Sequence, residues 1–161
     1  MPSCFGVVVA PLGRTAEREI ERLATRAHGV VTRGELLGVG VTVAEIRGRL
    51  ASGALIRVFP GVYRAGHRAR SVEAGYMAAV KGCGEGALLS GLAAAWLWGL
   101  VKGTAPRPEV SAPTERRLKG VKTRRQRELD RRQATTWRGI PITTVAARSS
   151  TSSSPGAIST P

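Results

Sequence analysis

The stretch TVAEIRGRLASGALIRVFPGVYR, residues 42–64, begins with the pattern of a helix and ends with the pattern of a β-hairpin. Thr42 stands three residues before Glu45, the spacing of a capping box, in which the threonine hydroxyl and the glutamate carboxylate accept hydrogen bonds from free backbone N–H groups. The segment TRGE at residues 32–35 repeats this spacing, and apolar residues recur on one side of a helix over residues 15–28. The sequence therefore predicts three helices in the order of a helix-turn-helix unit.

The helix that begins at Thr42 has an apolar side and a small, polar side. On a helical wheel, the side expected to face the core holds Val43, Ile46 and Leu50. The opposite side holds Ala44, Glu45, Gly48 and Ser52. Arg47 and Arg49 lie on the two flanks, where guanidinium groups can reach guanine edges or phosphates while small residues allow close approach to DNA. Taken alone, this helix fits a solvated surface equally well.

A hairpin is predicted directly after this helix. Apolar and polar residues alternate from Leu55 to Phe59, Pro60 and Gly61 supply a turn, and Val62 to Arg64 return. A hairpin in this position is the wing of a winged helix, whose basic residues would meet the DNA backbone. The candidate DNA contacts are therefore Thr42, Arg47 and Arg49 near base edges, and Thr32, Arg33, Arg57 and Arg64 on phosphates.

The charge of the chain points to a polyanionic partner. The 161 residues include 25 Lys and Arg against 11 Asp and Glu, a formal net charge of +14. Double-stranded DNA is the partner that such a field favours, and a merely solvated basic surface is the alternative. Cys4 and Cys83 form no CxxC motif, so a disulfide framework and a zinc site are not expected, which suits the cytoplasm. The apolar segment 86–101 is 16 residues long, shorter than the roughly 20 that span a bilayer, so no membrane segment is expected.

The second half of the chain predicts helices followed by strands. Residues 71–84 and 86–100 have the pattern of a helical hairpin, with ordinary packing roles for Trp96 and Trp98. Strands are predicted at 107–113, at about 120–128 and at 134–144. The expected fold class is α+β: a winged helix-turn-helix, then a helical hairpin packed with a small β-sheet, then a disordered tail. The corresponding segments are a flexible N-terminus (1–14), the winged helix (15–70), the second region (71–146) and the tail (147–161).

Three segments together resemble a known family. They are HGVVTRGELLGVGVTVAEIRGRLASGALIRVFPGVYRAGH at 28–67, CGEGALLSGLAAAWLWGL at 83–100 and RGIPITTVA at 138–146. Over residues 18–146 the chain resembles the AbiEi family of type IV toxin–antitoxin antitoxins, in particular its actinobacterial members, which often carry a very-short-patch-repair-like nuclease domain. The resemblance implies a winged helix that binds operator DNA and represses its own operon, and a later region that counters a nucleotidyltransferase-like toxin. It implies no catalytic residue in this chain.

The end of the sequence departs from that family. After residue 146 the chain continues as a Ser, Thr, Pro and Gly tract where the resemblance implies a further helix and the nuclease-like domain, as a truncation or frameshift would produce. His28 and His67 are the only histidines, and they have no catalytic or metal-binding spacing, so we expect no enzyme activity and no cofactor. The alternative to a regulator is a truncated remnant of a nuclease-domain protein that keeps only its DNA-binding front part. An RNA-binding or purely protein-binding basic module is the third possibility.

A second basic segment follows the predicted helices. Residues 114–138 contain ten Lys and Arg against three acids. The segment fits a second phosphate-contacting surface, a basic hairpin that faces an acidic protein, or a solvated strand face.

Overall fold

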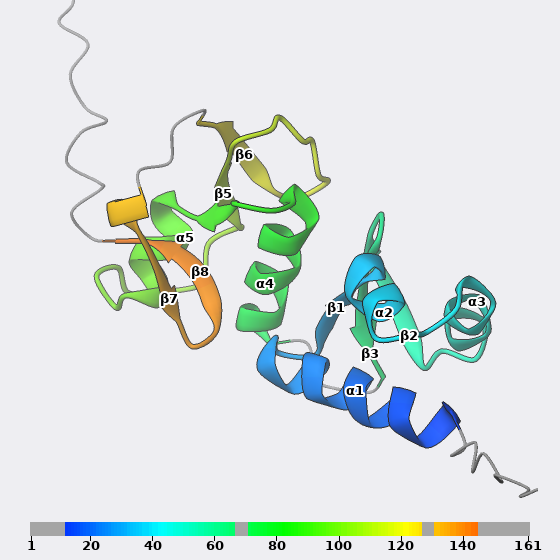
Figure 1. The fold of residues 1–161 in the computed structure, drawn as a ribbon. Coiled ribbons are helices and arrows are strands. Elements are labelled where there is room, and N and C mark those ends of the chain that lie inside the picture. Colours follow the sequence, from blue (N-terminus) through cyan, green and yellow to red (C-terminus); the bar gives the residue numbers. More distant parts are fainter. Residues whose placement is uncertain (1–11, 67–70, 127–130, 145–161) are drawn as a thin grey trace, which may run out of the picture. The chain divides into compact units, whose positions relative to one another are not determined.

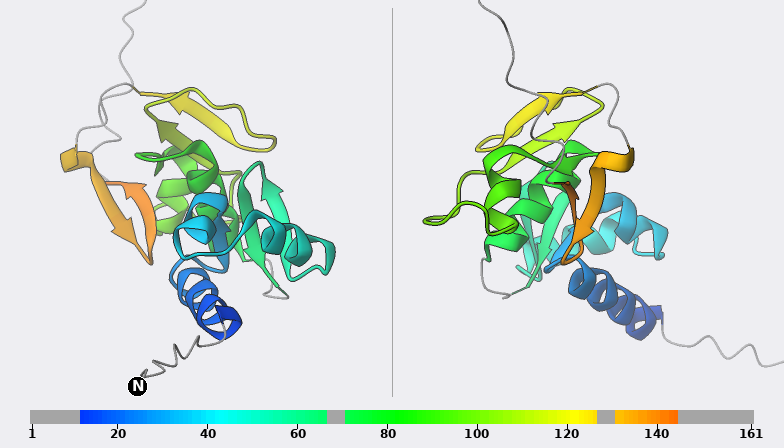
Figure 2. Two further views of the ribbon diagram at one scale, coloured as in Figure 1. Left: turned by 45° about the vertical axis from the view of Figure 1, so that its right-hand side comes forward. Right: turned by 90° about the vertical axis from the view of Figure 1, so that its left-hand side faces the viewer.

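A computed structural model describes residues 12–66, 71–126 and 131–144 of the chain, which divides into two units, residues 1–74 and 75–161. Figure 1 and Figure 2 show the elements of both units. The first unit contains α1 (Leu12–Arg26), β1 (Val30–Thr32), α2 (Arg33–Gly38), α3 (Val43–Ala51), β2 (Leu55–Phe59) and β3 (Val62–Ala65). Helix α4 (Val72–Cys83) begins in the first unit and continues into the second. The second unit then adds β4 (Leu88–Leu89), α5 (Gly91–Leu97), β5 (Glu109–Ala112), β6 (Lys122–Arg125), a 3-10 turn (Arg131–Gln133), β7 (Ala134–Trp137) and β8 (Ile140–Thr143).

Helix α1 has the amphipathic pattern that the sequence predicts. Ile20, Ala24 and Ala27 are buried, whereas Arg18 and Arg22 are exposed. The chain leaves the helix through Gly29, whose φ of +84° is a left-handed conformation that favours glycine. The N–H of Gly29 donates to the carbonyl of Ala24, which satisfies one of the free carbonyls at the end of the helix. The predicted first helix is thus confirmed.

Both predicted capping boxes are present. The hydroxyl of Thr32 accepts from the N–H of Glu35 at 3.1 Å, and the carboxylate of Glu35 accepts from the N–H of Thr32 at 2.7 Å. Thr42 and Glu45 repeat both contacts at 3.2 and 2.7 Å. Each box satisfies backbone donors that the first turn of a helix leaves free, and so fixes where α2 and α3 begin.

The wing is an antiparallel hairpin in a three-stranded sheet with the order β1-β3-β2 within the described residues. Pro60 and Gly61 form its turn, and Gly61 has a φ of +72°, as the third position of a type II turn requires. The register shifts between Arg57 and Phe59, so β2 carries a bulge near the turn. Strand β1 was not predicted, because three residues are too few to show an alternating pattern.

One small core joins the three helices to this sheet. Its buried members are Ala16, Ile20, Ala24, Val31, Leu36, Val41, Ile46, Leu55 and Tyr63, with Leu23, Val39, Leu50 and Ala65 packed against them. The prediction that Val43 points into the core is wrong, since 39% of Val43 is exposed. The buried side of α3 is centred on Ile46 and includes part of Arg49. Val43, in the first turn, therefore lies at the edge of the core. Three helices with a hairpin after the third form a winged helix-turn-helix, and α3 lies next to β2 (Figure 1).

In the second unit, one predicted helix is shorter than expected. Helix α4 confirms the helix predicted over residues 71–84, and the N–H of Ala74 donates to the hydroxyl of Ser71 at its start. The prediction of a helix over residues 86–100 is wrong in its first part, because Leu88 and Leu89 form strand β4 and α5 begins only at Gly91. These two leucines are buried and pair with β5 on one side, and Leu89 pairs with β8 on the other. Tertiary strand pairing thus overrides the apolar run that suggested a helix.

The second sheet has the strand order β6-β5-β4-β8-β7 among the described residues. Its centre is fully buried at Leu89, Val110, Ile140 and Ile142. Strands β5 and β6 confirm two predicted strands, whereas the strand predicted over residues 134–144 is a hairpin, β7 and β8, with a turn at Arg138 and Gly139. The α+β fold class is confirmed. The predicted disordered tail (147–161) and most of the flexible N-terminus (1–14) lie outside the described residues.

Trp96 in α5 and Trp98 directly after it both have packing contacts. Trp96 lies edge-on to Tyr76 with ring centroids 6.3 Å apart, and its indole N–H donates to the carbonyl of Gly103. Trp98 packs against Trp137 at 5.0 Å and donates to the carbonyl of Thr143. Among the helices described, none combines the length and the apolar character needed to cross a bilayer.

Candidate nucleic-acid interface

Helix α3 presents small residues and one arginine to solvent. Ala44, Arg47, Gly48 and Ala51 are exposed, and they recur at the spacing of one helical side. A Cβ added at Gly48 would meet no atom within 4 Å, so this side of the helix is open. Arg47 forms no ion pair within the described residues. Another molecule can therefore approach the helix closely here, with Arg47 beside it.

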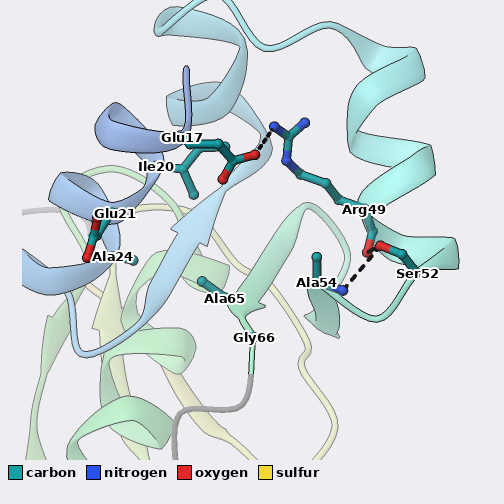
Figure 3. Close-up of a pocket in the computed structure, with 9 residues that line it drawn as sticks. All are labelled: Glu17, Ile20, Glu21, Ala24, Arg49, Ser52, Ala54, Ala65 and Gly66. Atoms are coloured by element: carbon teal, nitrogen blue, oxygen red, sulfur yellow. Dashed lines mark hydrogen bonds and ion pairs between the residues drawn. The ribbon is translucent and has the colours of Figure 1, made fainter. Parts of the chain in front are cut away.

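Arg49, on the other flank of α3, faces α1 instead of solvent. Its guanidinium donates to the carboxylate of Glu17 at 2.5 Å, and only 17% of its side chain is exposed (Figure 3). The pair borders a cavity of about 600 Å³ between α1, the end of α3 and the base of the wing. The cavity is lined by Glu17, Ile20, Glu21, Ala24, Arg49, Ser52, Ala54, Ala65 and Gly66. The two arginines of α3 thus have different surroundings.

The two threonines among the predicted contacts are engaged in helix capping. The hydroxyl of Thr42 accepts from the N–H of Glu45 and donates to its carboxylate at 2.8 Å, and Thr32 makes the same pair of contacts with Glu35. The hydrogen bonds from the N–H and then the hydroxyl of Thr42 hold the pKa of the Glu45 carboxyl below its ordinary value of 4.5. Both hydroxyls therefore position a helix, whatever else they contact.

Arg33 lies at the junction of α2 and the wing. Its backbone N–H donates to the carbonyl of Gly61 in the wing turn at 2.8 Å, while its side chain is exposed. The first residue of α2 is thus tied to the tip of the hairpin. The fold brings Arg33 and the wing turn, 28 positions apart in sequence, into one surface.

The two arginines of the wing lie on opposite faces of its sheet. Arg57 pairs with Tyr63, whereas Arg64 pairs with Ile56 on one side and Val30 on the other. Directly paired residues of antiparallel strands share a face and successive residues alternate, so Arg57 and Arg64 point in opposite directions. Arg57 is exposed. Arg64 is half-buried, and its Nε has no hydrogen-bond partner among the described residues.

The seven predicted contacts therefore differ in exposure and in structural role. Arg33, Arg47 and Arg57 are exposed, Arg49 and Arg64 are partly covered, and the two threonines are caps. Sequence reasoning did not identify Glu17 as the partner of Arg49, because the two residues are 32 positions apart and their contact depends on how α1 crosses α3. Within residues 12–66, 71–126 and 131–144, no three His, Cys, Asp or Glu side chains are grouped so that they could hold a metal ion.

Comparison with known proteins finds a family match within the first unit. No curated protein matches the chain. A family model described as transcriptional regulator, AbiEi antitoxin, matches residues 18–66, the segment that contains most of α1, both capped helices and the whole wing. Residues 18–66 of this chain therefore match the AbiEi antitoxin family of transcriptional regulators.

Proposed function

We propose that the winged helix binds duplex DNA upstream of its own gene and represses the operon. The observation that supports this most is that the residues matched by a family of transcriptional regulators are those that form α2, α3 and the wing. The exposed, small side of α3 fits the major groove, which is about 12 Å wide and admits an α-helix.

In this proposal each predicted contact has a role that follows from its surroundings. Arg47 reads a base edge, because it is exposed on the open side of α3 and a guanidinium can bond a guanine through two acceptors. Arg33 and Arg57 bind phosphates on the side of the wing turn.

Most of the remaining predicted contacts also stabilise or orient the helices of the winged helix. Thr32 and Thr42 hold the starts of α2 and α3, and Thr42 is the more exposed of the two. Arg49 fixes α3 against α1 through Glu17, and Arg64 adds a charge on the opposite face of the wing from Arg57.

We further propose that the chain acts as a regulator without catalysis, in the cytoplasm where its DNA target lies. Its partner in this proposal is a nucleotidyltransferase-like toxin encoded beside it. The family that matches residues 18–66 is a family of antitoxins, which supports a toxin as partner. Co-expression of the neighbouring gene with and without this chain tests that part, because an antitoxin restores growth that its toxin arrests.

Two measurements test operator binding. Fluorescence anisotropy compares the full chain on a duplex from its own upstream region and on a scrambled duplex of equal length and composition. We expect the affinity for the upstream duplex to be higher by at least about 10³-fold. This factor is the lower end of the usual difference between specific and non-specific DNA binding. A reporter fused to the same region should fall when the chain is expressed. Equal affinity for both duplexes with an unchanged reporter would overturn the proposal.

A further inference from the structure

A second concentration of positive charge lies in the second unit, away from the winged helix in sequence. Between residues 107 and 126 there are seven Lys and Arg against two Glu. All seven basic side chains are exposed, namely Arg107, Arg116, Arg117, Lys119, Lys122, Arg124 and Arg125. The last three belong to β6, which is at one edge of the sheet within the described part of the chain. We call residues 116–125 the β6 surface.

Few of these charges are neutralised by the protein itself. Lys122 lies 3.5 Å from a carboxylate oxygen of Glu109, and Arg117 lies 3.8 Å from a carboxylate oxygen of Glu115 in an exposed pair. The other basic residues of the β6 surface form no ion pair within the described residues. Four of the six basic residues of the β6 surface thus have no ion pair among the described residues, so the surface keeps most of its positive charge.

The register of β6 sets how the charges are arranged. Strand β6 runs parallel to β5, with Lys122 opposite Glu109 and Arg124 opposite Ser111. Lys122 and Arg124 therefore share one face and are about 6.6 Å apart along the strand, since parallel strands rise about 3.3 Å per residue. The N–H groups of Lys122 and Gln126 donate to β5 and its flank, so by alternation those of Thr123 and Arg125 point away from the sheet. Cationic side chains and outward-pointing backbone N–H groups thus lie together along β6.

We propose that the β6 surface binds the phosphate backbone of duplex DNA without regard to base sequence. Phosphates are bound by Arg, Lys and backbone N–H groups, the three kinds of donor that β6 carries. The proposal deepens the proposed DNA binding of the winged helix by adding sequence-independent contacts from the second unit. It does not depend on preference for an operator.

An acidic protein partner fits this surface less well. The centre of a protein interface is usually apolar and aromatic, with charged residues reduced in number. Leu118 and Val121 are both half-buried, and every other residue from 116 to 122 is exposed and is basic or glycine. The surface offers no apolar centre for a partner protein.

Protection of a sheet edge does not account for the surface either. Lysines on an edge strand prevent pairing with other chains, and one or two charges are enough for that purpose. The basic residues Arg116, Arg117 and Lys119 precede the strand, where there is no edge to protect. Strand β7, at the other edge among the described residues, contains no charge at all over Ala134–Trp137. Basic residues also flank β7, at Arg132 and Arg138, but of these two edge strands only β6 carries positive charge within the strand itself.

The test compares two triple variants of the full chain that remove the same net charge from the second unit. The first is Lys119→Gln, Arg124→Gln and Arg125→Gln, in the β6 surface. The control is Lys102→Gln, Arg132→Gln and Arg138→Gln, three exposed residues after α5 and around β7. Anisotropy gives the affinity for the upstream and the scrambled duplex between 50 and 200 mM salt, and thermal melting checks that each variant folds. If the first triple variant does not fold, Arg116→Gln, Arg117→Gln and Lys119→Gln replace it.

We expect the first variant to reduce the steepness of the salt dependence on both duplexes, and the control to leave it unchanged. Each lost phosphate contact lowers the log–log slope of affinity against salt by about 0.9, so the loss of three contacts lowers it by about 2.7. The loss of affinity between 50 and 200 mM salt then becomes about 40-fold smaller than in the wild type. Equal slopes for the two triple variants would overturn the proposal, and an unchanged slope in both would leave an acidic protein as the partner of this surface. A wild-type chain that does not distinguish the duplexes refutes operator binding but not this proposal, because the slopes are compared on each duplex separately.

Discussion

The guanidinium of Arg49 donates to the carboxylate of Glu17 at 2.5 Å and so ties the third helix of the winged helix to the first. Glu17 is the more exposed partner, with 64% of its side chain open to solvent. The contact competes with any approach of Arg49 to DNA, because one guanidinium in this position cannot also point to the outer side of α3. The pair makes Arg49 a residue that orients α3 against α1.

We predict that Arg49→Gln leaves the salt dependence of DNA binding nearly unchanged. Arg57→Gln, which removes an exposed wing arginine, lowers the log–log slope on duplex DNA by about 0.9. Arg49→Gln should cost less than about 1 kcal/mol of unfolding free energy, because the pair is partly exposed. Anisotropy across a salt series and urea denaturation measure the two effects. A drop in slope for Arg49→Gln as large as that for Arg57→Gln would mean that Arg49 leaves Glu17 and binds phosphate.

A substitution at Gly48 separates stability from DNA binding. Glycine costs about 1 kcal/mol relative to alanine inside a helix, and a Cβ at Gly48 meets nothing within 4 Å. We therefore expect Gly48→Ala to raise the unfolding free energy by up to about 1 kcal/mol. We also expect it to weaken DNA binding, since the new methyl group lies on the side of α3 that we propose enters the groove. Gly75→Ala in α4 is the matched control, because its Cβ is equally unobstructed. Tighter DNA binding by Gly48→Ala would contradict the orientation proposed for α3.

The capping box of α3 should contribute measurably to stability. Thr42→Ala removes the acceptor for the N–H of Glu45 and should lower the unfolding free energy by about 1 kcal/mol, the typical cost of losing such a cap. Thr42→Ser keeps the hydroxyl and serves as the control. Urea denaturation monitored by circular dichroism measures both variants. Equal stability of the alanine and serine variants would show that the cap is not formed in solution.

The same box predicts an acid sensitivity. The pKa of Glu45 is lower in the folded protein than its ordinary value of 4.5, so the stability that this carboxylate contributes is complete above pH 4.5. That contribution is lost as the pH falls through the lower folded-state pKa. We expect the melting temperature to fall less between pH 5 and pH 3 in Glu45→Gln than in the wild type. Glu21→Gln, on the exposed side of α1, controls for the loss of one carboxylate. Identical pH profiles of wild type and Glu45→Gln would contradict the assignment.

The features that could be predicted from the sequence are those encoded by near neighbours. The capping boxes at Thr32 and Thr42 need only residues three positions apart, and the wing turn needs only Pro60 and Gly61. Helical spacing alone placed Arg47 on a flank of α3, away from the core, and the structure shows it exposed.

The features that could not be predicted depend on tertiary contacts. Strand β1 exists because Val30–Thr32 pairs with β3, and Leu88–Leu89 forms a strand because partners flank it on both sides. Val43 was assigned to the core because a wheel cannot show how far α3 is turned toward α1. The opposite directions of Arg57 and Arg64 follow from the strand register, which the bulge before the turn shifts by one residue.

In the proposed binding mode α3 reads base sequence while the wing binds backbone, and a comparison of Arg47→Ala with Arg57→Ala separates the two roles. Anisotropy competition gives the ratio of affinities for the upstream and scrambled duplexes. We predict that Arg47→Ala reduces this ratio by roughly 5- to 150-fold, the value of one good base contact, whereas Arg57→Ala weakens both duplexes alike and keeps the ratio. A ratio that Arg47→Ala leaves unchanged would show that Arg47 does not read a base.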